Sequence, residues 1–391
     1  MTSSVGRIGF AVIGCGTAAW TGHLPWIWGH PHASLSAVCD SNLDAARQAQ
    51  TRFDVPVATA DFSEVLADPA VNAVSICTPP ATHAGLAIAA LEHGKHVLLE
   101  KPMARSLEEC DRIADCARAH GGRLMLAHEK RFSLAAQKIR DIVLRGEIGT
   151  PFHLSVNWGA AVKLAPDRLI PPGYGEGYRW RWTDPDVGGG ILQDHLPHYV
   201  DLWRWWTGSE VATVCTEAQH ISRDLLNQPE FGMWEDYGTV LMRFRNGAVG
   251  AFQTGTAGRA LSPILHIGSG IGEWSEFGYV FGTRGQIAFD FAPWDSAEIG
   301  RVMVWSLDGR GPDDRGWYQV EFPDPRRSPG GPLSPATNES HMFYRQIDSF
   351  IRCIRENRAA PVGTGDGRAT LAVIEAAYRS SQTGQKVSVK A

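Results

Sequence analysis

The sequence predicts a two-domain α/β protein that begins with a doubly wound parallel sheet. Three observations predict this fold. The chain has 391 residues, which is more than one hydrophobic core usually serves. Its first third alternates short apolar runs with helical segments, as strands and helices alternate in such a sheet. The first apolar run also leads directly into a glycine-rich turn.

Composition and charge argue against two classes of partner. With 43% apolar and 20% charged residues, the chain has the balance of an ordinary globular protein. Its net charge is −5 and it contains no block of Lys and Arg, so we expect no nucleic-acid partner. The apolar run at residues 8–15 is too short to span a bilayer, so we expect no membrane association and a cytoplasmic enzyme.

The cysteines point to a reducing compartment. There are seven of them, an odd number, and none belongs to a C-x-x-C pair. Cys15, Cys39 and Cys77 fall in apolar runs. We therefore expect them to be small buried core residues that form neither disulfides nor zinc sites.

The first strand and the turn after it carry a nucleotide-binding pattern. Ile8–Ile13 is continuously apolar, as in a parallel strand that is covered on both faces. The next six residues, Gly14–Ala19, read G-x-G-x-x-A. Gly14 permits the tight turn, and Gly16 lets the backbone approach a pyrophosphate. Thr17 and Ala18 would begin the following helix, whose free N–H groups bind phosphates.

A second apolar strand, Leu35–Cys39, ends in Asp40 and Ser41. An acidic side chain at this point can hydrogen-bond the adenosine ribose hydroxyls. Its charge would repel a 2′-phosphate, so the sequence favours NAD over NADP as the cofactor. The alternative is that Asp40 is a turn residue or the cap of a helix over residues 42–50.

Further strands and helices complete the predicted sheet. We expect strands near Val57 and at 73–77, 96–99 and 123–126, with helices at 61–67, 82–93 and 106–120. Ligands of such sheets bind beyond the carboxyl ends of the strands. Polar clusters stand there, and the residues expected to contact the cofactor are Thr78, Pro79, His83, Glu100, Lys101 and His128. Lys101 precedes a proline, so a stiff backbone would hold it towards the cleft; the alternative is an exposed surface lysine.

Residues 188–206 read GGGILQDHLPHYVDLWRWW, an apolar helix with ionisable groups in it. Asp194 and His198 are four residues apart and would lie on one helical face. Burying such groups is costly unless they have a partner or a task. Pro197 lacks an N–H group, so a kink or a helix start is expected near it.

Together these motifs resemble the Gfo/Idh/MocA family of sugar and inositol oxidoreductases. The matching segments are Gly14–Ala19 with His23, Thr78–His83, Glu100–Pro102, the G-G-G-x-x-x-D-x-x-x-H-x-x-D pattern at 188–201, and residues 343–354, 365–368 and 370–380. The resemblance implies an NAD-binding Rossmann domain at 1–127. It also implies a substrate-binding α/β domain at 128–391 with an open, mostly antiparallel sheet, through which a homodimer or homotetramer would form.

The resemblance also implies the chemistry. The helical face with Asp194 and His198 would look at the nicotinamide, with Lys101 opposite. His198 can take the hydroxyl proton near neutral pH, and Lys101 can stabilise the developing alkoxide. Asp194 would orient the substrate or join the proton relay, and the sequence does not divide this work between Asp194 and His198. The expected reaction transfers a hydride between a secondary ring hydroxyl of a sugar, glycoside or cyclitol and NAD.

Two other functions are open at this point. An enzyme with tightly bound, internally recycled NAD would oxidise the ring transiently, eliminate an aglycone and reduce the ring again, with His195 as an extra base. A sugar-sensing regulator would keep the fold without catalysis. The presence of Lys101, Asp194 and His198 argues against the regulator, as does the lack of a DNA-binding segment.

The substrate contacts are predicted less sharply than the cofactor contacts. Besides Lys101, Asp194 and His198, the candidates are Arg131, Lys163, Arg168, Tyr174, Tyr178, Arg179, Trp180, His195 and His341. The cations among them favour an anionic sugar or form a solvated surface. His195 is either a substrate or acid–base contact or a structural histidine. We expect no metal at Asp194, His195 and His198, because no further His/Cys motif accompanies them.

Overall fold

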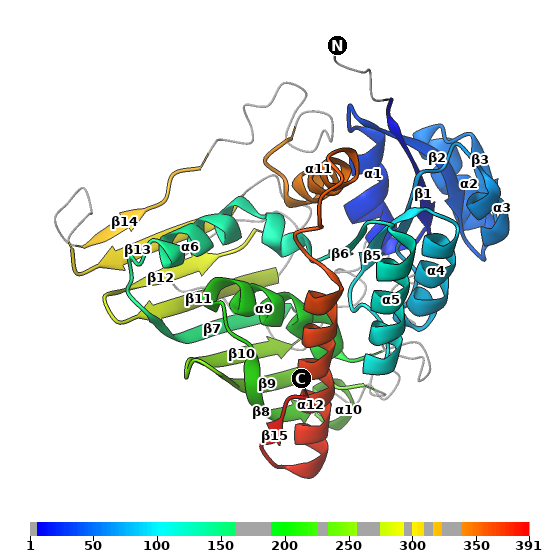
Figure 1. The fold of residues 1–391 in the computed structure, drawn as a ribbon. Coiled ribbons are helices and arrows are strands. Elements are labelled where there is room, and N and C mark those ends of the chain that lie inside the picture. Colours follow the sequence, from blue (N-terminus) through cyan, green and yellow to red (C-terminus); the bar gives the residue numbers. More distant parts are fainter. Residues whose placement is uncertain are drawn as a thin grey trace. The chain divides into compact units, whose positions relative to one another are not determined.

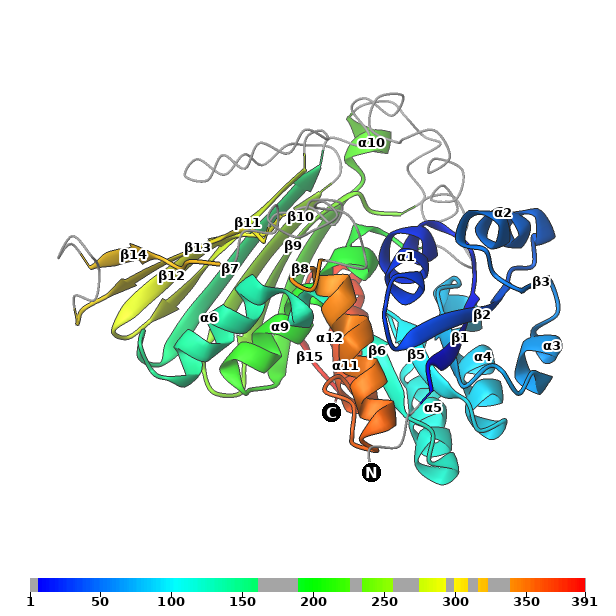
Figure 2. The ribbon, with the colours of Figure 1, turned by 90° about the horizontal axis from the view of Figure 1, so that it is seen from above.

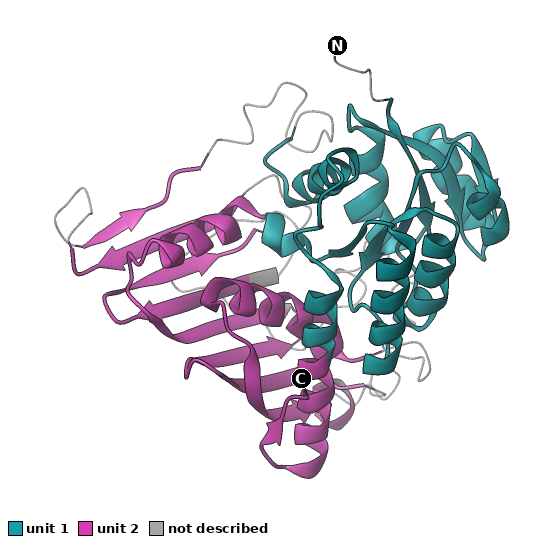
Figure 3. Ribbon diagram, viewed as in Figure 1, with its two compact units in different colours: residues 1–132, 326–371 teal, residues 133–325, 372–391 magenta. Residues whose placement is uncertain are grey.

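The computed structural model describes residues 6–160, 189–225, 234–255, 274–292, 299–308, 316–322 and 338–390. The chain forms two compact units (Figure 3). The first unit contains Met1–Phe132 and Arg326–Leu371, and the second contains Ser133–Pro325 and Ala372–Ala391. The chain thus passes from the first unit to the second after residue 132, and residues 326–371 belong to the first unit again. The domain limits of 1–127 and 128–391 stay a prediction.

The first unit is built on a six-stranded parallel sheet in the order β3-β2-β1-β4-β5-β6 (Figure 1). The strands are β1 Ile8–Ile13, β2 Ala33–Cys39, β3 Val57–Thr59, β4 Ala73–Ile76, β5 His96–Glu100 and β6 Leu124–Ala127. Every residue of β1 is buried, as its unbroken apolar run predicts. The strand order reverses next to β1, so the ends of β1 and β4 form the switch point where such sheets bind ligands. The predicted Rossmann domain is confirmed.

The helices of this unit are α1 Leu24–Trp28, α2 Leu43–Phe53, α3 Phe62–Ala67, α4 Pro80–Glu92, α5 Leu107–His120 and α11 Met342–Arg355. Side-chain caps begin helices α2, α3, α5 and α11, and a proline stands in the first turn of α1 and α4. The side chain of Asn42 accepts a hydrogen bond from the Asp44 backbone at the start of α2, and Asp61 does the same for Ser63 at α3. The cap of α2 is therefore Asn42, which removes that structural alternative for Asp40.

Helix α11, far along the chain, packs into the core of the first unit. The Phe350 ring is fully buried, and its centroid lies 6.1 Å from that of Phe10 on β1. Near the start of α11, a Cβ at Gly22 would lie 2.9 Å from the Phe343 ring. The loop after α11 adds a backbone hydrogen bond from Leu126 of β6 to Val362. These contacts explain why 326–371 belongs to the first unit.

The second unit is built on a nine-stranded sheet in the order β14-β13-β12-β11-β7-β10-β9-β8-β15. The strands are β7 Pro151–Ala160, β8 Val211–Gln219, β9 Tyr237–Phe244, β10 Val249–Gly255, β11 Trp274–Gly282, β12 Gly285–Asp290, β13 Arg301–Ser306, β14 Trp317–Gln319 and β15 Val387–Ser388. Only the β7–β10 pair among these is parallel. The expectation of an open, mostly antiparallel sheet is therefore confirmed.

Helices cover one face of this sheet (Figure 2). They are α6 Leu134–Leu144 and α9 Ile191–Thr207, joined by the last part of α12 Thr364–Thr383; α10 Ile221–Asp224 is a single turn. Trp203 and Tyr199 of α9 are fully buried, and Trp203 lies so close to Gly250 of β10 that a Cβ there would be 2.5 Å away. On β9, buried positions alternate with exposed ones such as Leu241. Among the residues that the structure describes, the side chains on the other face of β9 are therefore exposed.

Two further expectations can be compared with the structure. Cys15, Cys39 and Cys77 are buried free thiols, as predicted. Within the described ranges, no helix combines the length and the apolar character that a membrane span requires.

Replacing Phe350 with Ala should destabilise the first unit by about 3–5 kcal/mol, because a fully buried ring is lost from α11. Urea unfolding followed by tryptophan fluorescence measures the effect. Arg355→Ala, an exposed position on the same helix, should change the stability by less than about 0.5 kcal/mol. Equal unfolding midpoints for both variants would contradict the packing of α11 described above.

Candidate active site

The glycine-rich turn after β1 has the geometry that a pyrophosphate needs. Gly14 has a φ of +87°, and a Cβ there would lie 2.9 Å from Thr78, so the loops after β1 and β4 touch. Gly16 differs, because a Cβ there would meet nothing within 4 Å. Thr17 and Ala18 follow as the first helical residues. Open space above Gly16, next to a helix N-terminus, fits a bound phosphate group.

Asp40 stands at the end of β2 and braces the glycine-rich turn. One carboxylate oxygen accepts a hydrogen bond from the Cys15 backbone N–H at 2.7 Å, and the other accepts one from Asn42 at 2.8 Å. Each oxygen has a second lone pair, so the carboxylate can still accept ribose hydroxyls. The neighbouring Ser41 is exposed. Asp40 therefore both holds the turn and offers a negative charge beside it.

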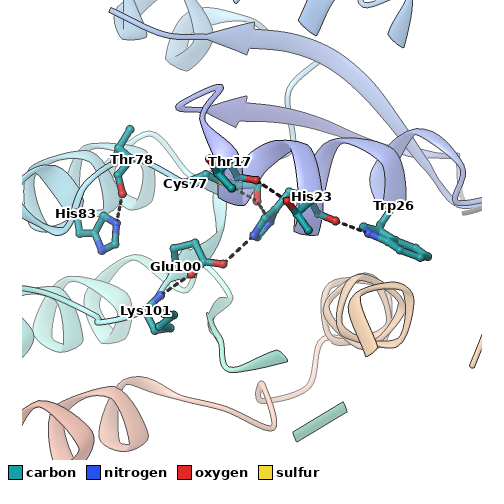
Figure 4. A network of polar contacts seen from close by, with 10 residues as sticks. Thr17, His23, Trp26, Cys77, Thr78, His83, Glu100 and Lys101 are labelled. Carbon is teal, nitrogen blue, oxygen red and sulfur yellow. Dashed lines mark hydrogen bonds and ion pairs between the residues drawn. The ribbon is translucent and has the colours of Figure 1, made fainter. Parts of the chain in front are cut away.

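A buried network holds the backbone of Lys101 at the end of β5 (Figure 4). His23 Nε2 lies 2.9 Å from Glu100 Oε1, and Ser75 Oγ lies 2.7 Å from His23 Nδ1. The other carboxylate oxygen of Glu100 accepts the Lys101 N–H at 3.0 Å. Burial alone would lower the pKa of His23, but the Cys77 sulfur and Glu100 raise it to about 10. Burial would raise the pKa of Glu100, and His23 and Lys101 hold it below its usual value.

His83 contacts Thr78 in the loop after β4 (Figure 4) and also the loop after β5. It lies in the first turn of α4 and is fully buried. Its ring nitrogens are 2.9 Å from the Pro102 carbonyl oxygen and 2.8 Å from that of Thr78. Burial lowers its pKa, so the ring is neutral and donates one of these two bonds at a time. The segment that starts at Lys101 is thus fixed from both sides.

The other predicted residues of the first unit are well packed. His128 follows β6 and is 2% exposed. The Arg131 guanidinium donates to Asp366 Oδ1 at 2.8 Å and to the Pro361 carbonyl oxygen at 3.1 Å. His341 stacks on Trp26 with ring centroids 4.2 Å apart and caps α11. These contacts tie Arg131 and His341 into the first unit, and their roles towards a substrate stay predictions.

Asp194, His195 and His198 are buried on one helix of the second unit, at 1%, 4% and 2% exposure. Helix α9 begins at Ile191 and continues through Pro197. Of the two possibilities expected near Pro197, the helix start is therefore wrong and the kink stays a prediction. Asp194 and His198 consequently are one turn apart, on the same face. The His195 ring stacks on Trp158 of β7, with centroids 3.7 Å apart. That stacking gives His195 a clear packing role.

Sequence reasoning missed one residue at the start of α9. Glu235 precedes β9 and is 4% exposed. Its backbone carbonyl accepts from Ile191 at 3.1 Å, and its carboxylate accepts from Leu192 at 3.0 Å. The acid stands outside every motif, so the sequence contained only an indirect signal, the glycines before α9 that leave room for it.

Some predicted residues lie outside the described residues: Lys163, Arg168, Tyr174, Tyr178, Arg179, Trp180 and Gly188. In the described part of the chain, a group of three side chains close enough to bind a metal ion is formed by Glu92, Cys116 and His120. Asp194, His195 and His198 do not form such a group there.

Comparison with known proteins agrees with this geometry. Residues 8–128 match the oxidoreductase family model with an NAD-binding Rossmann fold, and residues 140–389 match the model of its C-terminal α/β domain. The chain is 27% identical to a myo-inositol 2-dehydrogenase of Thermotoga maritima, over 92% of this chain and 91% of the relative. It is 26% identical to a levoglucosan dehydrogenase of Pseudarthrobacter phenanthrenivorans, over 97% of each chain.

A solved structure of levoglucosan dehydrogenase in complex with NADH and levoglucosan has a similar fold. Its TM-score is 0.78, at 22% identity, over 98% of this chain and 100% of that one. The two family models together cover most of the chain. The protein therefore belongs to the Gfo/Idh/MocA family of oxidoreductases, with an NAD-binding Rossmann domain followed by the family's C-terminal α/β domain.

Proposed function

We propose that the protein is an NAD-dependent dehydrogenase that acts on a secondary ring hydroxyl of a sugar, glycoside or cyclitol. The relatives named for inositol and levoglucosan oxidation support this substrate class. The observation that carries the proposal is the Glu100 network. It fixes the backbone of Lys101 at the carboxyl end of β5, where parallel sheets bind ligands.

The proposed roles follow from the residue types. When bound, the nicotinamide accepts the hydride from the carbinol carbon. Lys101 donates a hydrogen bond to the substrate oxygen and stabilises its developing negative charge. His198 accepts the hydroxyl proton, since an imidazole titrates near neutral pH. Asp194, one turn away, orients a neighbouring hydroxyl or passes the proton on.

We also propose that NAD is preferred over NADP. Asp40 presents a carboxylate at the end of β2, close to the turn that would hold the pyrophosphate. A 2′-phosphate there would meet a like charge at short range, whereas ribose hydroxyls can donate to it.

A homo-oligomer is the further part of the proposal, and it would form through the open face of the nine-stranded sheet. Leu241 on β9 is 49% exposed and lies between the buried Val240 and Met242. Tyr279 and Phe281 on β11 are partly exposed. An uncovered sheet with apolar and aromatic side chains is typical of a protein interface.

A reducing, cytoplasmic setting would fit the buried free thiols.

Lys101→Ala should reduce kcat by about 10²–10³-fold, because the oxygen loses its electrostatic partner. NADH absorbance with NAD and a panel of inositols, anhydrosugars and glycosides measures the reaction. His198→Ala and Asp194→Asn should also lower kcat, and exposed Lys386→Ala should not. Unchanged turnover in Lys101→Ala would refute the proposed mechanism. Release of an aglycone without net NADH would instead identify the enzyme with internally recycled NAD.

Asp40→Ala should weaken NAD binding by about 10–100-fold, because a charged acceptor contributes about 1.5–3 kcal/mol. The discrimination against NADP should shrink at the same time. Cofactor titration by tryptophan fluorescence measures both affinities. Asp40→Asn keeps an oxygen for the Cys15 N–H, so it separates loss of charge from damage to the turn. An undiminished preference for NAD in both variants would rule out this role of Asp40.

Leu241→Lys should convert an oligomer to monomers, because it buries a charge in the proposed interface. Light scattering after size exclusion gives the mass of each species. Leu144→Lys is the matched control, since this leucine is 63% exposed at the end of α6. A wild-type chain that is monomeric at roughly tens of micromolar, where a weak interface already forms, would contradict the proposal.

A further inference from the structure

The start of α9 is anchored by a side chain from a distant part of the sequence. The first N–H groups of a helix have no partner within the helix. Gly190 stands at the cap position and has no side chain to offer. Glu235 supplies both acceptors, its backbone oxygen to Ile191 and its carboxylate to Leu192. Glu235 therefore binds the first turn of the helix that carries Asp194 and His198.

The anchor is closely fitted. A Cβ at position 190 would lie 2.0 Å from the Glu235 carboxylate. A residue larger than glycine at this position would therefore clash with the carboxylate as it is placed in the structure. Tyr378 of α12 donates its hydroxyl hydrogen to the same carboxylate oxygen, at 2.9 Å. Within the second unit, three separate segments thus meet at one oxygen atom. Such a meeting fixes both the starting point of α9 and its rotation about its axis.

We propose that Glu235 is a positioning residue, held by Tyr378 and fitted against Gly190, that sets the orientation of Asp194 and His198. This inference rests on the proposed function for its catalytic consequence. Asp194 lies in the first turn after the anchor, and its own N–H donates to the Gly190 carbonyl at 3.2 Å. A shift of the anchor therefore passes directly to Asp194 and, one turn later, to His198.

The carboxylate is also sensitive to pH. Burial raises the pKa of Glu235 to about 7, against the hydrogen bonds from Leu192 and Tyr378, and the charge of Asp236 adds to the rise. Tyr378 and Asp236 are the titratable groups that act on it; burial and Glu235 raise the pKa of Tyr378. Folding raises the pKa of Glu235 above its usual value of 4.5. The contribution of Glu235 to the free energy of unfolding is therefore fully present below about pH 4.5 and is lost as the pH rises through about 7.

Hydrogen exchange of the peptide that covers 191–198, read by mass spectrometry, tests the anchor without any assay of activity. Glu235→Ala should speed exchange in this segment by at least about tenfold, because the Leu192 N–H loses its carboxylate acceptor and Tyr378 loses its partner, while Ile191 keeps only the backbone carbonyl of residue 235. Glu235→Gln keeps the accepting oxygen and should stay within about threefold of wild type. Tyr378→Phe, which removes one hydrogen bond and little volume, should give an intermediate effect and serves if Glu235→Ala does not fold.

The close fit supplies a second test. Gly190→Ala should loosen α9 in the wild-type background but add little in the Glu235→Ala background, because the clashing carboxylate is gone. Glu147→Ala is the matched control. This acid also accepts a hydrogen bond from a tyrosine, Tyr318, in the same unit, and its loss should leave exchange in α9 unchanged. Additive effects of Gly190→Ala and Glu235→Ala would overturn the proposal.

Kinetics separates positioning from simple stability. In Glu235→Ala, kcat should fall by about 10-fold or more while the affinity for NAD is unchanged, and Glu235→Gln should restore kcat. Glu235→Gln should also abolish the loss of thermal stability that Glu235 causes between about pH 4.5 and 7. If no NADH forms with any substrate, the proposed function fails and the exchange result still decides the anchor. If Glu235→Gln behaves like Glu235→Ala, or exchange is unaffected, the anchor is refuted.

Discussion

The functional parts of this protein depend on one constraint: buried backbone N–H groups at the ends of strands and helices need acceptors. Three carboxylates meet it. Asp40 accepts from the glycine-rich turn, Glu100 from the backbone of Lys101, and Glu235 from the first turn of α9. Asp40 and Glu235 come from one element and fix another, whereas Glu100 accepts from the residue that follows it and is itself held by His23. The proposed chemical groups are therefore carried on backbone that side-chain carboxylates hold in place.

The partner of each buried carboxylate decides its charge. Glu100 is paired with His23, a cation whose pKa is raised to about 10, so its own pKa is lowered. In the described part of the chain, the Glu235 carboxylate accepts from the Tyr378 hydroxyl and the Leu192 N–H, and burial raises its pKa to about 7. The first anchor therefore keeps its charge across the physiological range. Glu235 changes its protonation state within that range, and the change acts on the first turn of α9, which is bonded to Glu235.

Much of the fold was predictable because its signals are local. Continuous apolar runs such as Ile8–Ile13 mark buried parallel strands, and the glycine-rich turn after this run marks the switch point. The role of Glu235 was not predictable in this way, since its partners come from residues 190–192 and 378. The same applies to the pairing of His23 with Glu100. Long-range contacts of single polar atoms leave no periodic trace in a sequence.

The course of α9 at Pro197 shows the same limit, because the sequence left both a kink and a helix start open there. A proline lacks the N–H that would bond to the carbonyl of Gln193, so local rules end a helix there. In the structure α9 runs through it, from Ile191 to Thr207. Its later turns are buried through Tyr199 and Trp203, while its first turn is bonded to Glu235. Tertiary contacts on both sides of the proline outweigh one missing hydrogen bond. The segment before Pro197, which holds Asp194, has the fewer bonds within the helix, and it depends most on the Glu235 anchor.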